Sequence, residues 1–126
     1  MTVVLDASAL LAYLQDEPGS EVVDEVLAES VISSVNWAEV VQKTIAGGIE
    51  SDGLLDDLQA LGLRVEAFTW KDAELAGKLW LQTKTAGLSL GDRACLSLGW
   101  RLDVSIMTCD RIWDSLNLDF DVKVIR

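Results

Sequence analysis

Hydrophobic residues in this chain fall into short continuous runs and into longer stretches where apolar positions recur every three or four residues. The runs are rich in β-branched residues, which is typical of buried strands in a parallel sheet. They predict strands over residues 2–5, 31–33, 64–68, 104–107 and 122–125. The longer stretches have the spacing of helices. They predict helices over residues 7–14, 21–29, 34–46, 52–61, 70–85, 89–100 and 111–116.

Turn-forming residues separate these elements. Pro18 and Gly19 mark a turn over residues 16–20, and Gly47 and Gly48 follow the third predicted helix. Short strands that alternate with helices predict an α/β domain with a parallel sheet. The chain has 126 residues and no repeat, low-complexity tract or linker. We therefore expect residues 1–126 to form one domain.

The amino-acid composition argues against several classes of protein, including membrane-spanning, secreted and disulfide-rich proteins. Half of the residues are hydrophobic and the mean hydropathy is +0.27, which is ample for a core and favours a further interface with a partner. No apolar stretch approaches the ~18 residues that span a bilayer, and Asp6 interrupts the N-terminal run, so we expect neither a membrane segment nor a signal peptide. The chain has two cysteines and no histidine, which excludes a disulfide framework and an ordinary four-ligand zinc site. These features indicate the cytoplasm.

The net charge of the chain disfavours binding to nucleic acids. Ten basic residues against 21 acidic ones give a net charge of −11 and a pI near 4.2. Nucleic-acid-binding proteins usually carry the opposite sign, and an acidic surface repels phosphate. Two bound divalent cations would change −11 only to −7. A nucleic-acid partner therefore requires local contacts from a few Arg and Lys residues, or positive charge from another protein.

Four acidic residues lie in separate segments, each beside an apolar run or near the start of a helix. These residues, the acidic quartet, are Asp6 in VVLDASALL, Glu39 in SSVNWAEVV, Asp92 in LSLGDRACL and Asp110 in SIMTCDRIWD. In α/β sheets, sites form beyond the carboxyl ends of the strands, where Asp6 and Asp110 are expected. If the quartet converges, it forms an all-oxygen pocket suited to Mg²⁺ or Mn²⁺.

Helix capping offers a different explanation for three of these acids. Asp6 and Asp110 stand where N-caps are expected, and Ser89 to Asp92 resembles a capping box. Glu39, in a mostly apolar stretch, is harder to explain by capping. Two carboxylates ~4 Å apart repel by about 4 kcal/mol at an effective dielectric near 20. A convergent quartet therefore calls for a cation, whereas capping explains each acid separately, and both interpretations stay open.

The segments DASALLAYL, SSVNWAEVV, LSLGDRACL and TCDRIWDSL resemble the PIN domain family, in particular the VapC-type toxins of bacterial and archaeal toxin–antitoxin pairs. The resemblance covers essentially the whole chain, and GDRACL followed by TCDRIW is its most specific part. It implies a PIN-like α/β fold with a parallel five-stranded sheet flanked by helices. It also implies a Mg²⁺- or Mn²⁺-dependent endoribonuclease that acts on RNA, forms a homodimer and binds a cognate antitoxin protein.

The resemblance also assigns roles to residues. The quartet Asp6, Glu39, Asp92 and Asp110 would be catalytic, with Asp6, Asp92 and Asp110 holding the metal. Supporting roles would belong to Ser8, Asn36 and Thr108, and to Asp114 as an additional acid. Arg93 is a further supporting candidate for a separate reason, because it directly follows Asp92 in the sequence. Arg93 and Arg111 would contact phosphate or hold ligand carboxylates, unless they are simply solvated. Because no histidine is available for acid–base catalysis, we expect water to attack the phosphate and leave a 5′-phosphate and a 3′-hydroxyl.

Other functional classes fit less well. An aspartate-based phosphohydrolase of the haloacid dehalogenase type needs Asp-x-Asp after the first strand, and the chain has Asp6-Ala7-Ser8. A receiver-type signalling domain needs an acidic pair near the first strand and a late lysine after a strand, and neither is evident. A PIN fold that has lost its activity and only binds a partner remains an alternative, although the chain keeps all four acids.

Overall fold

A computed structural model describes all residues, Met1–Arg126. It contains a five-stranded sheet in the order β3-β2-β1-β4-β5, and every neighbouring pair is parallel. The strands are β1 (Val3–Leu5), β2 (Ser30–Ser33), β3 (Arg64–Glu66), β4 (Ser105–Thr108) and β5 (Val122–Val124). The expected parallel five-stranded sheet is confirmed.

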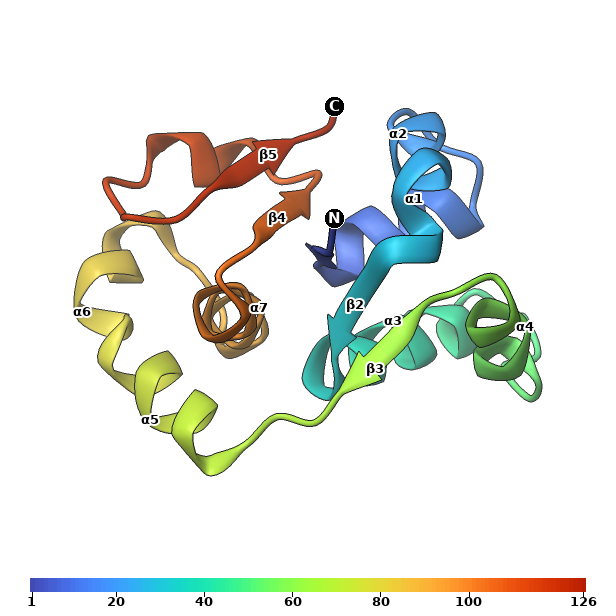
Figure 1. Cartoon of the computed structure of the whole chain (residues 1–126), viewed down its shortest axis with the longest axis horizontal. Helices are drawn as coiled ribbons and strands as arrows, with labels where there is room; N and C mark the ends of the chain where they lie inside the picture. The colour runs from blue at the N-terminus through green and yellow to red at the C-terminus, as the bar shows by residue number, and fades with distance from the viewer.

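Helices cover both faces of the sheet. The α-helices are α1 (Ala7–Leu14), α2 (Ser20–Val26), α3 (Ser34–Ala46), α4 (Leu54–Ala60), α5 (Trp70–Lys78), α6 (Trp80–Thr83) and α7 (Leu90–Leu102). Three 3₁₀ turns, η1 (Leu27–Glu29), η2 (Lys84–Ala86) and η3 (Arg111–Ser115), complete the chain. Helices α1 to α4 lie on one side of the sheet and α5 to α7 on the other (Figure 1). None of these helices has the length and apolar character that crossing a membrane requires.

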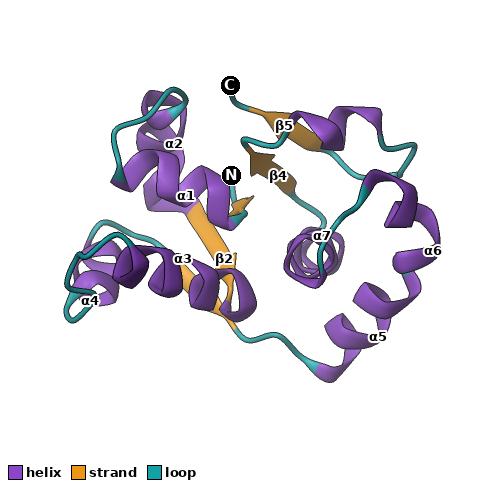
Figure 2. Ribbon diagram, turned by 180° about the vertical axis from the view of Figure 1, so that it is seen from behind, coloured by secondary structure: helices purple, strands orange, loops and turns teal.

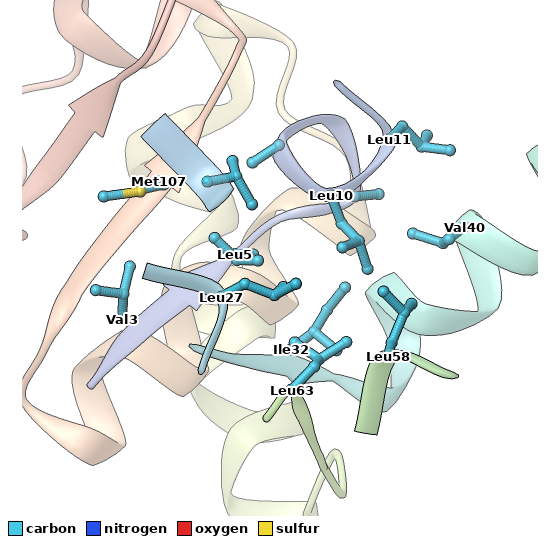
Figure 3. Close-up of a cluster of buried hydrophobic side chains, with 13 residues drawn as sticks. Val3, Leu5, Leu10, Leu11, Leu27, Ile32, Val40, Leu58, Leu63 and Met107 are labelled. Carbon is cyan, nitrogen blue, oxygen red and sulfur yellow. The ribbon is translucent and has the colours of Figure 1, made fainter. Parts of the chain in front are cut away.

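The core is divided between the two faces by the alternation of side chains along each strand. Val3 and Leu5 of β1 belong to a cluster with α1, α3 and α4, drawn in Figure 3. Val4, between them, belongs to a second cluster built mainly with α7. The same alternation separates Met107 from Ile106 in β4. Both faces of the central strands are therefore buried, which explains their continuous apolar sequence.

One predicted helix is divided in the structure. The sequence pattern predicts a helix over residues 70–85, whereas α5, α6 and η2 share this segment and form an arc around α7 (Figure 2). The break is at Leu79, which is buried. The hydroxyl of Thr83 donates to the carbonyl of Leu79 at 2.8 Å, and such a bond to the i−4 carbonyl bends a helix. Burial of Leu79 and Thr83 against the core therefore outweighs the continuous helical pattern.

The strand order fixes where a site can form. From β1 the chain adds β2 and then β3 on one side, and it returns to place β4 and β5 on the other side. The direction of winding therefore reverses between β1 and β4. In open α/β sheets, the crevice outside the carboxyl ends of the strands at such a point is where ligands bind. Asp6 and Asp110 follow the two strands that flank this point.

Candidate functional site

The acidic quartet converges at the carboxyl edge of the sheet. Asp6 follows β1 directly, and Asp110 is the second residue after β4. Glu39 lies in α3, which begins where β2 ends, and Asp92 lies in the first turn of α7. All four side chains line one cavity of about 330 Å³, here called the acidic cavity. The four sequence segments therefore contribute to a single site.

Three members of the quartet also cap helices. Asp6 accepts a hydrogen bond from the backbone N–H of Ala9 at 2.8 Å, and Asp110 accepts one from Ile112 at 3.1 Å. Asp92 accepts from the N–H of Ser89 at 2.9 Å, while the Ser89 hydroxyl accepts from the N–H of Asp92, which is a capping box. The capping interpretation is confirmed for these acids, and it is compatible with convergence. Capping fixes the carboxylates of Asp92 and Asp110 through one oxygen each.

Two hydroxyls hold Asp6 in place. Its Oδ1 accepts from the Ser8 hydroxyl at 2.7 Å, and its Oδ2 accepts from the Thr108 hydroxyl at 2.5 Å. The Thr108 oxygen in turn accepts from the backbone N–H of Asp110 at 3.0 Å. The Ser8 oxygen accepts from the N–H of Cys109 at 2.9 Å. Ser8 and Thr108 therefore connect the end of β1 to the end of β4 and position both Asp6 and Asp110.

Burial makes the Asp6 carboxyl unusual. Its side chain is 4% exposed, and this burial raises its pKa from 3.8 to about 6. Hydrogen bonds from Thr108, Ala9 and Ser8 oppose the increase, and the negative charge of Asp92 adds to it. Removal from water is the largest cause because it disfavours the charged form. Asp6 is thus a buried carboxylate with several hydrogen-bond donors and no cationic partner.

Asn36 connects Glu39 to α7. Its Nδ2 donates to Oε1 of Glu39 at 2.8 Å and to the carbonyl of Gly91 at 2.9 Å. Both partners are acceptors, so the orientation of this amide is fixed, and its Oδ1 is buried without a partner. Gly91 makes this contact possible, because a Cβ there would lie 2.6 Å from Oε1 of Glu39. Gly91 was not recognised from the sequence, although it directly precedes Asp92.

Sequence reasoning also missed polar residues around the same cavity. Gln15, Glu17, Lys43 and Arg126 line it together with the quartet. Lys43 stands four residues after Glu39 on α3, and this spacing is visible in the sequence. Arg126 follows β5, so its approach to the cavity depends on the strand order and has no signal in the sequence.

Three residues suggested by the sequence lie elsewhere. Asp114, in η3, lines a separate hollow of about 140 Å³ and not the acidic cavity. Nη1 of Arg93 donates to the carbonyl of Ala76 at 2.8 Å, which connects α7 to α5. Nε of Arg111 donates to the backbone carbonyl of Arg126 at 3.2 Å. In this structure the arginines connect elements of the fold, and none of the three residues joins the quartet.

The donors around the acidic cavity suit a hard divalent cation in kind. The cavity offers carboxylate oxygens, the Ser8 hydroxyl and the Asn36 amide, with no histidine or cysteine, and oxygen ligands are those that Mg²⁺ and Mn²⁺ prefer. The buried, raised-pKa carboxyl of Asp6 fits the same interpretation. However, no group of three or more acidic or cysteine side chains is close enough together to hold a metal ion as arranged here. The donors therefore fit a divalent cation in kind, although their side chains are not drawn together around one point.

A hollow larger than the acidic cavity lies away from these acids. It measures about 640 Å³ and is lined by residues before β1, around the connection from α7 to β4 and just before β5, including Trp100 and Phe120. These residues lie at the amino ends of β1, β4 and β5, the edge of the sheet opposite to the quartet. Size alone therefore does not identify the site, and the converging carboxylates do.

Comparisons with known proteins agree with this fold. The family model of the PIN domain matches residues 3–117. A toxin–antitoxin complex from Klebsiella pneumoniae contains a chain with 16% identity and a TM-score of 0.76, and the match covers 98% of each chain. VapBC-1 from nontypeable Haemophilus influenzae gives 17% identity and a TM-score of 0.71, covering 98% of this chain and 97% of that chain.

A further similar structure is VapBC2 from Rickettsia felis bound to a DNA fragment from its promoter. It gives 15% identity and a TM-score of 0.68, with 98% of each chain covered. At these identities the solved structures establish a shared fold. No curated protein matches the sequence significantly. The family model spans most of the chain, and on that basis the chain belongs to the PIN domain family.

Proposed function

We propose that this protein is a Mg²⁺- or Mn²⁺-dependent endoribonuclease that acts as the toxin of a toxin–antitoxin pair. PIN domains are typically nucleases, and these nucleases generally use divalent metal ions. The observation that carries the proposal is the convergence of Asp6, Glu39, Asp92 and Asp110 on one cavity. This cavity lies where an α/β sheet binds ligands, between the ends of β1 and β4.

The toxin role rests on the similar solved structures. Those proteins are toxin–antitoxin complexes that share this fold over nearly the whole chain. We propose accordingly that a cognate antitoxin binds this protein, that the protein forms a homodimer, and that it acts in the cytoplasm as one domain. A basic antitoxin segment would also offset the net charge of −11.

Asp6, Asp92 and Asp110 would hold the metal. A bound divalent cation stabilises charge on a phosphate oxygen and lowers the pKa of bound water. The rest of the chemistry belongs to side chains of the chain itself. Ser8 and Thr108 keep Asp6 in position, and Asn36 keeps Glu39 in position to orient the attacking water or a second cation. Since the chain has no histidine, hydrolysis by water gives a 5′-phosphate and a 3′-hydroxyl.

A cleavage assay on a pool of structured cellular RNAs tests this function. Folded protein free of antitoxin is assayed with Mg²⁺ or Mn²⁺ and with EDTA, and Asp92→Asn is the matched control. The Asn side chain keeps an acceptor for the Ser89 N–H and removes only the charge, so the capping box survives. We expect metal-dependent cleavage that is lost in the variant. Ends carrying 2′,3′-cyclic phosphate would contradict the proposed chemistry.

The main alternative is a PIN fold that binds a partner without catalysis. Isothermal titration with Mn²⁺ separates the two cases independently of any RNA. A nuclease site should bind Mn²⁺ in the wild-type protein and more weakly in Asp92→Asn. An inactive module should show weak binding or none in either protein. An aspartate-based phosphohydrolase gains no support, because Ser8 stands where its second acid is needed.

A further inference from the structure

Two basic side chains face the acidic cavity, and the proposed function leaves both without a role. The chain has ten Lys and Arg residues, of which only Lys43 and Arg126 line this cavity. Five acidic residues line it as well, namely the quartet and Glu17. Five negative against two positive charges leave −3, so the cavity is acidic overall with two local points of positive charge.

Lys43 is free of an ion pair. It lies four residues after Glu39 on α3, a spacing at which Glu and Lys often attract each other. Here the Glu39 carboxylate is held by Asn36 at 2.8 Å and lies against Gly91. The structure has three ion pairs, and Lys43 takes part in none of them. Its exposed ammonium is therefore available to a ligand in the cavity.

Arg126 is held through its backbone and has a weakly engaged side chain. The N–H of Ile125 donates to the carbonyl of Thr108 at 2.9 Å, which continues the pairing of β4 with β5. Nη1 of Arg126 lies 3.4 Å from both Oε1 of Glu17 and the carbonyl of Pro18. The Arg126 and Glu17 side chains are 36% and 41% exposed, and such surface pairs contribute little stability. The guanidinium can therefore exchange this partner for a phosphate, which it binds in a bidentate manner.

The strand order places the backbone segments that carry the two cations on either side of the strands that lead to Asp6 and Asp110. Lys43 is carried by the helix after β2, and Arg126 follows β5. The ends of β1 and β4, with Asp6 and Asp110, lie between β2 and β5 in the sheet. Figures 1 and 2 show the end of the chain near α2, on the side of β4 away from β2. A chain of phosphates that crosses the carboxylates would meet one cation before them and the other after them.

We propose that Lys43 and Arg126 bind the backbone phosphates on either side of the scissile phosphate of an RNA strand. This inference rests on the proposed nuclease function and adds the contacts that position the substrate. It also explains how a chain of charge −11 binds a polyanion. Repulsion from distant acids is screened over about 10 Å at 0.1 M salt, whereas the two cations contact phosphate directly.

The salt dependence of RNA binding tests the inference. A fluorescein-labelled single-stranded RNA, containing a cleavage site mapped in the assay above, is titrated with protein in Mg²⁺ at several salt concentrations. The Asp92→Asn background keeps the RNA intact. Lys43→Gln and Arg126→Gln are measured as single variants and as a double variant. Lys78→Gln is the control, because Lys78 is an exposed lysine of α5 outside the cavity. Thermal unfolding verifies that each variant is folded.

Each cavity substitution should weaken binding by about tenfold at low salt, which is typical for a hydrogen bond to a charged group. Each should also reduce the slope of log Kd against log salt by about 0.7, and the double variant by about 1.4. Lys78→Gln should change neither quantity. If wild-type protein cleaves RNA while the cavity variants keep the parental slope, the inference is wrong and the nuclease proposal stands. If the wild-type protein neither cleaves the RNA pool of the assay above nor binds it in a filter-binding measurement, both fail.

Discussion

Asn36 holds Glu39 by a 2.8 Å hydrogen bond from Nδ2 to Oε1. The same amide group donates to the carbonyl of Gly91 at 2.9 Å, so the two amide hydrogens fix an acid of α3 against the first turn of α7. Asn36 is 1% exposed, and its environment allows little movement. This contact joins two segments that are 55 residues apart, and it orients the one member of the quartet that caps no helix.

Substitution of Asn36 should therefore impair turnover more than substrate binding. Asn36→Ala frees the Glu39 carboxylate and leaves the Gly91 carbonyl without this partner. We expect kcat to fall by about 10- to 100-fold, as for residues that orient metal ligands, with a smaller change in KM. Steady-state cleavage of a fluorescent RNA measures both constants. Asn117→Ala, at an exposed position outside the acidic cavity, is the control, and an equal loss of kcat in both variants would contradict the assigned role.

Gly91 should tolerate no side chain. A Cβ at this position would lie 2.6 Å from Oε1 of Glu39 and 2.8 Å from its Cδ and Oε2, so Gly91→Ala must displace the carboxylate. We expect RNA cleavage to fall by at least the factor seen for Asn36→Ala, because the same carboxylate moves. Gly77→Ala is the matched control, since a Cβ there meets nothing within 4 Å. That variant should be up to about 1 kcal/mol more stable and fully active.

The raised pKa of Asp6 predicts how stability depends on pH in metal-free protein. The native state holds this proton more tightly than the unfolded chain, because burial raises the pKa from 3.8 to about 6. The stabilisation is fully present below pH 3.8 and is lost as the pH rises through about 6. The gap corresponds to about 3 kcal/mol.

Urea unfolding in EDTA between pH 4 and pH 7 measures this effect. The free energy of unfolding of the wild-type protein should fall relative to that of Asp6→Asn across this range, because Asn cannot titrate. The Asn variant is the control for all other titrating groups. Parallel curves for the two proteins would show that the Asp6 carboxyl ionises at an ordinary pKa.

Much of the fold was visible in the sequence because local and global signals agree. The strands β1 and β4 are buried on both faces. Their sequences are therefore continuous apolar runs, which can be recognised without the structure. Asp92 shows why the site was harder to predict. Asp92 both forms a capping box and lines the acidic cavity. The capping-box pattern in the sequence therefore explains one role of this residue without excluding the other.

The position of Asp114 depends on whether its segment is an α-helix or a 3₁₀ helix. It lies four residues after Asp110, a separation that in an α-helix places two side chains on nearly the same face. This segment is the 3₁₀ helix η3, with three residues per turn, so four residues rotate the side chain by about 120° beyond a full turn. Asp114 consequently faces the hollow beside Trp113. Arg126 was missed for a different reason, because only the order of the strands brings it to the cavity.

Thr108 should be required for its hydroxyl and not for its volume. It donates to Oδ2 of Asp6 at 2.5 Å and accepts from the N–H of Asp110 at 3.0 Å, and it is fully buried. Thr108→Val keeps the shape but leaves the N–H of Asp110 and one oxygen of Asp6 without this partner. We expect a loss of about 1 to 3 kcal/mol in the free energy of unfolding and weaker Mn²⁺ binding in calorimetry. The pKa of Asp6 should rise further, because the Thr108 hydrogen bond lowers it.

Thr108→Ser distinguishes the contribution of the hydroxyl from that of the methyl group. It restores both hydrogen bonds and removes one buried methyl, so Mn²⁺ binding should return to near the wild-type value while stability recovers only in part. If the serine variant binds Mn²⁺ as weakly as the valine variant, packing by the methyl group positions Asp6 and Asp110. If both variants bind as the wild-type protein does, the hydrogen bonds from Thr108 do not position these acids for the metal.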